Sequence, residues 1–83
     1  SAFATIKALP ATTYYQIVDA HNDQIIIPYS NATKISANSN GGYFDFYTTM
    51  MYPERYYKFE IKSVIDGVTE YFSSNDFIFK ITK

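Results

Sequence analysis

Apolar and polar residues alternate along much of this chain, in short stretches that recur about every ten residues. Alternation with a period of two puts apolar side chains on one face of a β-strand and polar side chains on the other. In residues 56–65, Phe59 and Ile61 alternate with Lys58 and Glu60, and the apolar set is expected to face inward. Strands of this length and spacing are typical of an all-β sandwich or barrel.

The pattern predicts seven strands, or eight if the final stretch is divided in two. They are expected over residues 2–9, 14–19, 24–29, 34–37, 43–49, 56–65, 68–72 and 77–81. The second and third strands are candidates for a hairpin. Residues 38–42 form the strongest turn signal, because Asn and Gly tolerate a positive φ.

Asp66 and Gly67 stand between two strands and predict a two-residue type I′ hairpin turn. This turn pairs residue 65 with 68, 63 with 70, 62 with 71 and 61 with 72. It therefore places Glu70 on the inner face beside Ser63, so that either this end of the sandwich is open or the register slips. The inward-facing residues have even numbers as far as residue 72 and odd numbers from residue 77 onward. This change requires a bulge or a kink between the two residues.

Length and charge limit the possible classes of protein. A chain of 83 residues and 9.6 kDa forms one domain, residues 1–83. It begins Ser1-Ala2 without Met, so we interpret it as a piece of a longer polypeptide, with a small free-standing protein as the alternative. Seven basic and eight acidic residues without a basic cluster argue against a nucleic-acid partner. The absence of an apolar run of 18 residues argues against membrane insertion.

The chemistry-bearing residues predict no enzyme and no cofactor. His21 is the single histidine and lies in an expected loop without a nucleophile near it in sequence. Asp19, Asn22 and Asp23 resemble the start of a calcium loop, but the glycine and the closing glutamate are missing. The chain has no cysteine, and its acidic residues are spread over separate strands. We therefore expect no catalytic residue, no metal site and no cofactor-binding residue.

Tyrosine is abundant, with nine residues, and several are expected to face outward. Tyrosine is favoured in interfaces because it combines apolar area with a polar tip and few rotatable bonds. The same residues also stabilise sheets through cross-strand aromatic pairs, which is the alternative interpretation. The candidate interaction surface consists of Tyr14, Tyr43, Tyr47, Tyr56 and Tyr71.

One local motif indicates the type of β-sandwich. The sequence from Met51 to Ile61 has an apolar residue, then Pro53, then Tyr57, then alternating apolar residues. This resembles the tyrosine corner of fibronectin type III and related immunoglobulin-like domains. The resemblance implies a single immunoglobulin-like, fibronectin type III-like Greek-key sandwich of about seven strands. In it Tyr57 packs into the core and its hydroxyl bonds to backbone near Pro53, with Met51 as an apolar plug.

The chain departs from that family in one respect, since the usual tryptophan of the early strands is absent. Tyr15, Ile25 or Ile27 is expected to fill the space. A second resemblance covers residues 53–80, which are similar to C-terminal sandwich segments of virion proteins of tailed bacteriophages. It implies a non-enzymatic structural module that acts in capsid decoration, or in docking at the neck, tail or baseplate. Its partners would then be other virion proteins or host-surface proteins.

The alternative function is a carbohydrate- or cell-surface-binding module of a secreted or virion protein, with an extracellular location. The two functions differ in what the tyrosines do. A docking module buries them against protein, whereas a sugar-binding module places two or three rings around a concave site with polar side chains nearby.

Overall fold

The structure is a computed structural model that describes residues 2–6, 12–38, 41–73 and 75–82, and within them eight strands. The strands are β1 (Ala2–Ile6), β2 (Thr12–Asp19), β3 (Ile25–Ile27), β4 (Ser36–Asn38), β5 (Gly41–Phe46), β6 (Tyr56–Ile65), β7 (Val68–Phe72) and β8 (Ile78–Lys80). Two single 3₁₀ turns, η1 (Asn31–Thr33) and η2 (Asn75–Phe77), complete the regular elements. The prediction of an all-β fold is confirmed.

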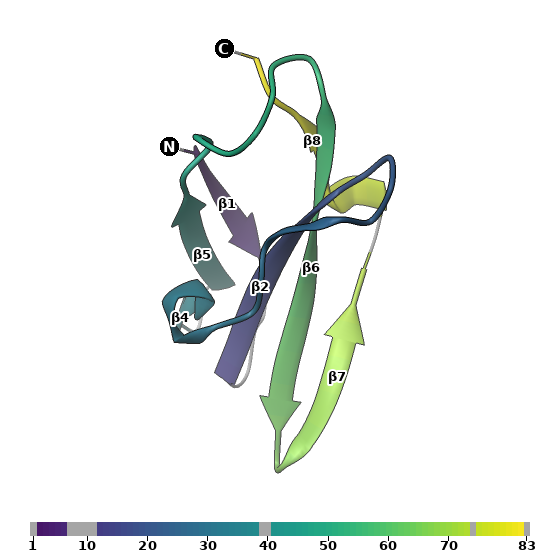
Figure 1. Ribbon diagram of the computed structural model, residues 1–83. Coiled ribbons are helices and arrows are strands. Elements are labelled where there is room, and N and C mark those ends of the chain that lie inside the picture. Colours follow the sequence, from purple (N-terminus) through teal and green to yellow (C-terminus); the bar gives the residue numbers. More distant parts are fainter. Residues whose placement is uncertain (1, 7–11, 39–40, 74, 83) are drawn as a thin grey trace.

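The strands form two antiparallel sheets (Figure 1). The smaller sheet has the order β1-β5-β4, and the larger one has the order β3-β2-β6-β7, with β8 also paired to β6. Each sheet therefore combines strands from both halves of the chain: β1 and β4 pair with β5 in one sheet, and β2 pairs with β6 in the other. The predicted hairpin of the second and third strands is present as β2 and β3.

The core lies between the two sheets and consists largely of aromatic and branched side chains. In the larger sheet Tyr15 pairs with Ile61, and both side chains are buried. From the smaller sheet, Phe44 stacks on Tyr15 with ring centroids 4.0 Å apart, and Phe46 lies beside Phe44. Strand alternation explains this arrangement, because every second residue of β2, β5 and β6 points toward the opposite sheet. Of the residues considered for the place of the missing tryptophan, Tyr15 is buried here and Ile25 is exposed.

One polar pair lies on the inner face, where β2 begins and β6 ends. Thr13 and Ser63 are cross-strand partners and both are buried. Their hydroxyl groups are 2.9 Å apart and form a hydrogen bond. A buried hydroxyl is costly without a partner, so this bond allows two polar residues to lie where the apolar core ends.

The β6–β7 hairpin has the register that Asp66 and Gly67 predict. Residue 65 pairs with 68, 63 with 70, 62 with 71 and 61 with 72. Asp66 has a φ of 50° and Gly67 a φ of 78°, and a type I′ turn requires a positive φ at both positions. All residues of β7 are exposed, including Glu70. Of the two alternatives for Glu70, the open end is therefore correct, and the register does not slip.

Inward-facing residues have even numbers in β7 and odd numbers in β8. The 3₁₀ turn η2, which directly precedes β8, accommodates this change. β7 pairs with residues 61–65 of β6, and β8 pairs with residues 56–58 along the same edge of that strand. The stretch is therefore divided, and the chain has eight strands in its described part. Phe79 faces Tyr57 in this register and packs beside it.

Several expected boundaries were wrong. The strand expected over residues 24–29 covers only Ile25–Ile27, because Pro28 has no N–H to continue the ladder. The strand expected over 34–37 is displaced to Ser36–Asn38. Ser30 caps a 3₁₀ turn before it, with its side chain accepting from the backbone N–H of Ala32.

The other differences concern strand ends. The strand expected over 14–19 begins two residues earlier, at Thr12, and the strand expected over 43–49 runs from Gly41 to Phe46. The first strand ends at Ile6 in the described part, and the remainder of its expected range, residues 7–9, lies outside the described residues. Residues 39–40 of the expected turn also lie outside them.

Candidate functional site

The Tyr57 motif serves the fold rather than a ligand. The Tyr57 side chain is 1% exposed, and its hydroxyl accepts the backbone N–H of Tyr52 at 2.8 Å. Met51 is buried in the same core cluster, whereas Pro53 is exposed in the loop. The hydroxyl thereby holds the loop between β5 and β6 against the start of β6. A buried phenol needs such a partner, and the connecting loop supplies a free backbone group.

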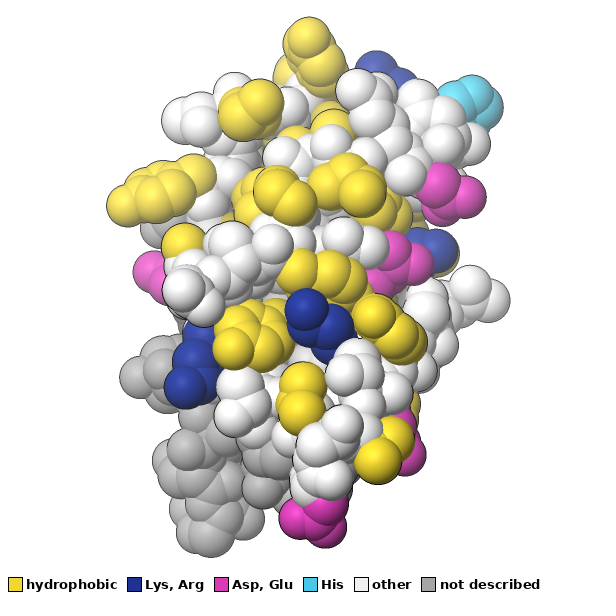
Figure 2. Space-filling view, turned by 60° about the horizontal axis from the view of Figure 1, so that its bottom comes forward, with side chains coloured by type: hydrophobic (Ala, Val, Ile, Leu, Met, Phe, Trp, Pro, Cys, Tyr) yellow, Lys and Arg dark blue, Asp and Glu magenta, His cyan; other side chains and the backbone are white. Residues whose placement is uncertain are grey.

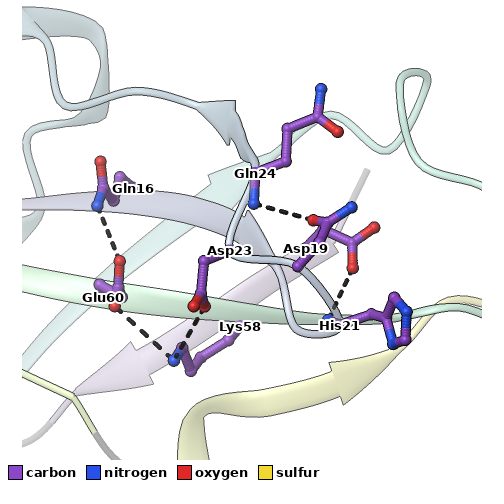
Figure 3. A network of polar contacts seen from close by, with 8 residues as sticks. Gln16, Asp19, His21, Asp23, Gln24, Lys58 and Glu60 are labelled. Carbon is purple, nitrogen blue, oxygen red and sulfur yellow. Dashed lines mark hydrogen bonds and ion pairs between the residues drawn. The ribbon is translucent and has the colours of Figure 1, made fainter.

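A second polar cluster lies at the end of β2. The buried carboxylate of Asp19 lies 3.0 Å from the guanidinium of Arg55 and also accepts the backbone N–H of His21. A hollow of about 330 Å³ is lined by these residues together with Ala20 and Tyr56. The His21 ring points away from the network (Figure 3). The Asp19 oxygens are thus engaged by groups of the chain itself, which indicates a structural role.

The most developed arrangement of polar and aromatic groups is on the outer face of β2, β6 and β7. The ammonium group of Lys62 lies 5.1 Å from the ring centroid of Tyr14 and 4.8 Å from that of Tyr29. Tyr29 in turn lies 6.4 Å from the ring of Tyr71 in a tilted arrangement. Cations are attracted to aromatic faces at such distances, so Lys62 orders the rings around it. Figure 2 shows a face of the molecule on which hydrophobic side chains gather with basic and acidic groups among them.

A separate chain of polar contacts lies farther along the outer face of β2 and β6 and reaches Asp23 in the loop after β2 (Figure 3). The amide of Gln16 donates to a carboxylate oxygen of Glu60 at 2.8 Å. The ammonium group of Lys58 lies 3.8 Å from Glu60 and 4.0 Å from Asp23. The contacts fix the direction in which the Glu60 carboxylate points.

Between these groups lies a shallow depression of about 160 Å³, which we call the tyrosine pocket. It is lined by Gln16, Tyr29, Glu60, Tyr71, Phe72 and Ser73. Burial, and to a smaller degree the neighbouring Glu60 and Tyr71, raise the pKa of Tyr29 to about 12. Like any tyrosine, Tyr29 is protonated at neutral pH and is a hydrogen-bond donor, and the raised pKa extends this state to more alkaline pH.

The tyrosine pocket combines two kinds of group. Aromatic rings offer flat apolar faces, while the Glu60 carboxylate and the Gln16 amide offer hydrogen bonds at its edge. Its volume is smaller than the roughly 300–1,000 Å³ of sites for drug-sized molecules. The geometry therefore suits either a protein side chain or a small polar ring.

The structure separates the tyrosines of the candidate interaction surface. Tyr14 and Tyr71 lie together around Lys62 and Tyr29, as described above. Tyr56 is exposed near the opposite end of β6, where it pairs with Lys80 of β8. Tyr47 is also exposed, directly after β5 of the other sheet, and the side chain of Tyr43 lies outside the described residues. Tyr14 and Tyr71 thus share one cluster, whereas Tyr56 lies farther along the same outer face and Tyr47 follows a strand of the other sheet, so the shared interaction surface stays a prediction.

Sequence reasoning missed Tyr29, Gln16, Glu60 and Lys62 as members of the site. The alternation in β6 does place Glu60 and Lys62 on the outer face, which is the signal that was available. Tyr29 gives no such signal, because it follows Pro28 and belongs to no strand. Its position over the sheet results from the path of the segment between β3 and η1.

Comparison with models of protein families, with curated proteins and with solved structures finds no match to this chain. Among the described residues, no group of three or more His, Cys, Asp or Glu side chains could hold a metal ion. The same part of the chain contains no helix with the length and apolar character needed to cross a membrane.

Proposed function

We propose that this chain is an immunoglobulin-like β-sandwich that acts as a non-enzymatic docking module of a tailed-phage virion protein. The strand orders support the fold assignment. In immunoglobulin-like domains the strands named B, E and D are neighbours in one sheet, and G, F, C and C′ are neighbours in the other. The orders β1-β5-β4 and β7-β6-β2-β3 follow these two sequences of neighbours.

The corner residue gives a second line of support. In the family the corner tyrosine stands near the start of strand F and bonds back to the backbone a few residues upstream. Tyr57 is the second residue of β6, which takes the place of F, and its hydroxyl accepts the N–H of Tyr52. This agreement supports the proposed fold class, and the proposed place in a virion rests on the expected resemblance of residues 53–80 to virion sandwich segments.

The observation that carries the docking function is the ordered aromatic surface on the outer face of the larger sheet. Tyr14, Tyr29 and Tyr71 are linked through Lys62 and through each other, so their rings are oriented before any partner arrives. Preordered tyrosines lose little conformational entropy on binding and are enriched at protein interfaces. Tyr71 is nevertheless 69% exposed, so its ring is available to a partner.

Oxidative footprinting of tyrosines tests this function by comparing the intact phage particle that carries the sequence with the isolated chain. Tyr71 is expected to react in the isolated chain and to be protected in the particle, because a docked face excludes water and radicals. Tyr57 is the internal control, since it is buried in both states. Equal reactivity of Tyr71 in both samples, or absence of the chain from purified particles, would contradict the proposal.

A second candidate function is the binding of a saccharide, which the tyrosine pocket specifically favours. Two rings, Tyr29 and Tyr71, border a concave site that also contains the Glu60 carboxylate and the Gln16 amide. Sugars stack their C–H faces on aromatic rings and direct their hydroxyl groups to such polar atoms. This function predicts glycan-array binding that is lost in Tyr71→Ala and kept in Tyr47→Ala, a matched variant whose exposed ring lies outside the pocket.

A further inference from the structure

β7 is the last strand at one side of the larger sheet, and the backbone groups of two of its five residues point away from that sheet. In a two-residue hairpin the residues that flank the turn exchange hydrogen bonds, here residues 65 and 68. Because direction alternates along a strand, Val68, Glu70 and Phe72 direct their N–H and C=O groups to β6. Those of Thr69 and Tyr71 point outward. Within the described part of the chain, no further backbone hydrogen bond reaches Thr69 or Tyr71.

The side chains of β7 leave this edge accessible. Val68 is 60% exposed and Phe72 is 44% exposed, although both lie on the face of the sheet that is turned toward the core. Native edge strands are commonly protected by lysine, proline, a bulge or an inward-pointing charge. The sequence Val-Thr-Glu-Tyr-Phe contains no lysine or proline, and Glu70 is its single charged residue. The pairing of β7 with β6 is also continuous over five residues, without a bulge. An edge with these properties is a template for one more strand.

Charge indicates what kind of strand fits. Glu70 lies in the middle of β7 on the same face as Val68 and Phe72, and no described cationic side chain lies within ion-pair distance of it. A second copy paired symmetrically about this residue would bring two Glu70 carboxylates directly opposite each other. Like charges in that position destabilise a sheet, whereas an opposite charge stabilises it. In the symmetric registers centred on Thr69 or Tyr71, Glu70 would lie opposite an apolar residue and would still lack a cationic partner. A different chain that carries a basic residue therefore satisfies Glu70 better than a second copy does in any of these registers.

We propose that β7 binds an extended segment of a partner protein by strand addition, with a lysine or arginine opposite Glu70. Apolar residues two positions to either side of the basic residue would face Val68 and Phe72. The backbone of the segment would pair with the N–H and C=O groups of Thr69 and Tyr71. This inference rests on the proposed docking function and specifies the partner: an extended peptide of the form apolar-x-basic-x-apolar.

Amide hydrogen exchange of the isolated chain tests the free edge without any substitution. The amides of Thr69 and Tyr71 are expected to exchange quickly, and those of Val68, Glu70 and Phe72 more slowly, because only the latter bond to β6. Protection of Thr69 and Tyr71 in the isolated chain would mean that the edge is already occupied, and it would overturn the inference.

Peptide selection tests the occupant. The probe is a displayed library of random linear peptides of about nine residues, near the upper limit of ordinary strand length. Selected peptides are expected to carry a basic residue between apolar ones and to slow the exchange of the Thr69 and Tyr71 amides. Thr69→Pro is expected to weaken their binding about tenfold, because it removes an outward N–H and no bond to β6. Thr69→Val is the matched control that keeps the N–H, and its binding is expected to be unchanged.

The substitution Glu70→Gln removes the negative charge of β7 and keeps the outward backbone groups of Thr69 and Tyr71. It is expected to weaken binding of the basic peptides about two- to fivefold, the usual range for a cross-strand charge pair. Absence of selected binders, or binders that are indifferent to Thr69→Pro, would overturn strand addition. Self-association that Thr69→Pro abolishes would show that a second copy occupies the edge, and it would also overturn the proposal.

The docking function and strand addition can fail separately. Tyrosine footprinting reports on the side chains of the outer face, whereas amide exchange reports on the backbone of the edge. If the Tyr71 ring is protected in the particle while the Thr69 and Tyr71 amides still exchange freely in that particle, the docking function is retained and strand addition is refuted.

Discussion

β7 and β8 lie one after the other along the same edge of β6, yet they have opposite environments. The inward residues around β8 are covered: Phe79 packs against Phe46, and Ile81 is buried. The inward residues of β7 are exposed, although Val68 and Phe72 are equally apolar. The smaller sheet covers only part of the larger one, and this explains the difference. Apolar residues of a strand therefore lie in the core at one position and on the exposed surface at the other.

The largest effect is expected from removal of the ring at the centre of the covered region. Tyr57→Ala should lower the free energy of unfolding by about 3–5 kcal/mol, because it leaves a cavity and frees the N–H of Tyr52. Urea titration followed by circular dichroism measures the change. Tyr56→Ala is the control, since this exposed neighbour should change stability by about 0.5 kcal/mol or less.

The contribution of the Tyr57 hydroxyl can be separated from that of its ring. Tyr57→Phe should cost about 1 kcal/mol, the usual value of one neutral hydrogen bond. A loss as large as that of the alanine variant would mean that the ring contributes little, and it would contradict the assignment of Tyr57 to the core.

A matched pair of substitutions examines the two strands directly. Phe79→Ala in β8 should lower the free energy of unfolding by about 2 kcal/mol, less than for a fully buried phenylalanine because the ring is partly exposed. Phe72→Ala in β7 should cost about 0.5 kcal/mol or less, because its ring is 44% exposed. The same urea titration measures both, and equal losses would refute the contrast between the strands.

The last effect is expected only above pH 10 and concerns Tyr29, which packs beside Tyr71 of the uncovered strand. An unfolded tyrosine releases its proton near pH 10, whereas burial raises the pKa of Tyr29 to about 12. Between these pH values the folded state retains a proton that the unfolded state has lost, so stability falls as the pH rises. This contribution is fully present below pH 10. Tyr29→Phe should therefore lose less stability between pH 10 and 12 than the parent chain, as measured by urea titration at each pH. An identical pH dependence would contradict burial of the hydroxyl.

The parts of the fold that could be predicted from sequence depend on short-range signals. Asp66 and Gly67 specify a turn and hence the whole β6–β7 register, and alternation specifies which β6 residues face inward. The strand around residues 25–27 was less predictable, because Pro28 both continues an apolar run and ends the ladder. Local pattern is sufficient where one turn determines the pairing.

The candidate site could be predicted only in part. Tyr14 and Tyr71 were identified because they alternate with inward residues, but their neighbour Tyr29 comes from an irregular segment. The tyrosine pocket combines residues from four separate parts of the chain, and no sequence interval encodes such proximity. The exposure of β7 likewise depends on how far the opposite sheet extends. These properties arise from tertiary packing, which acts between residues distant in sequence.

The buried bond between Thr13 and Ser63 also determines how β2 can align with β6. Sliding β2 by two residues would keep the same faces inward, so hydrophobicity alone would hardly distinguish the shifted alignment from the correct one. In the shifted alignment, however, each hydroxyl would lie opposite an apolar side chain, and the bond between Thr13 and Ser63 would be lost. A neutral hydrogen bond contributes about 0.5–1.5 kcal/mol, a noticeable share of the stability of so small a domain. This pair of hydroxyl groups thus favours the observed alignment of the two central strands over alignments shifted by two residues.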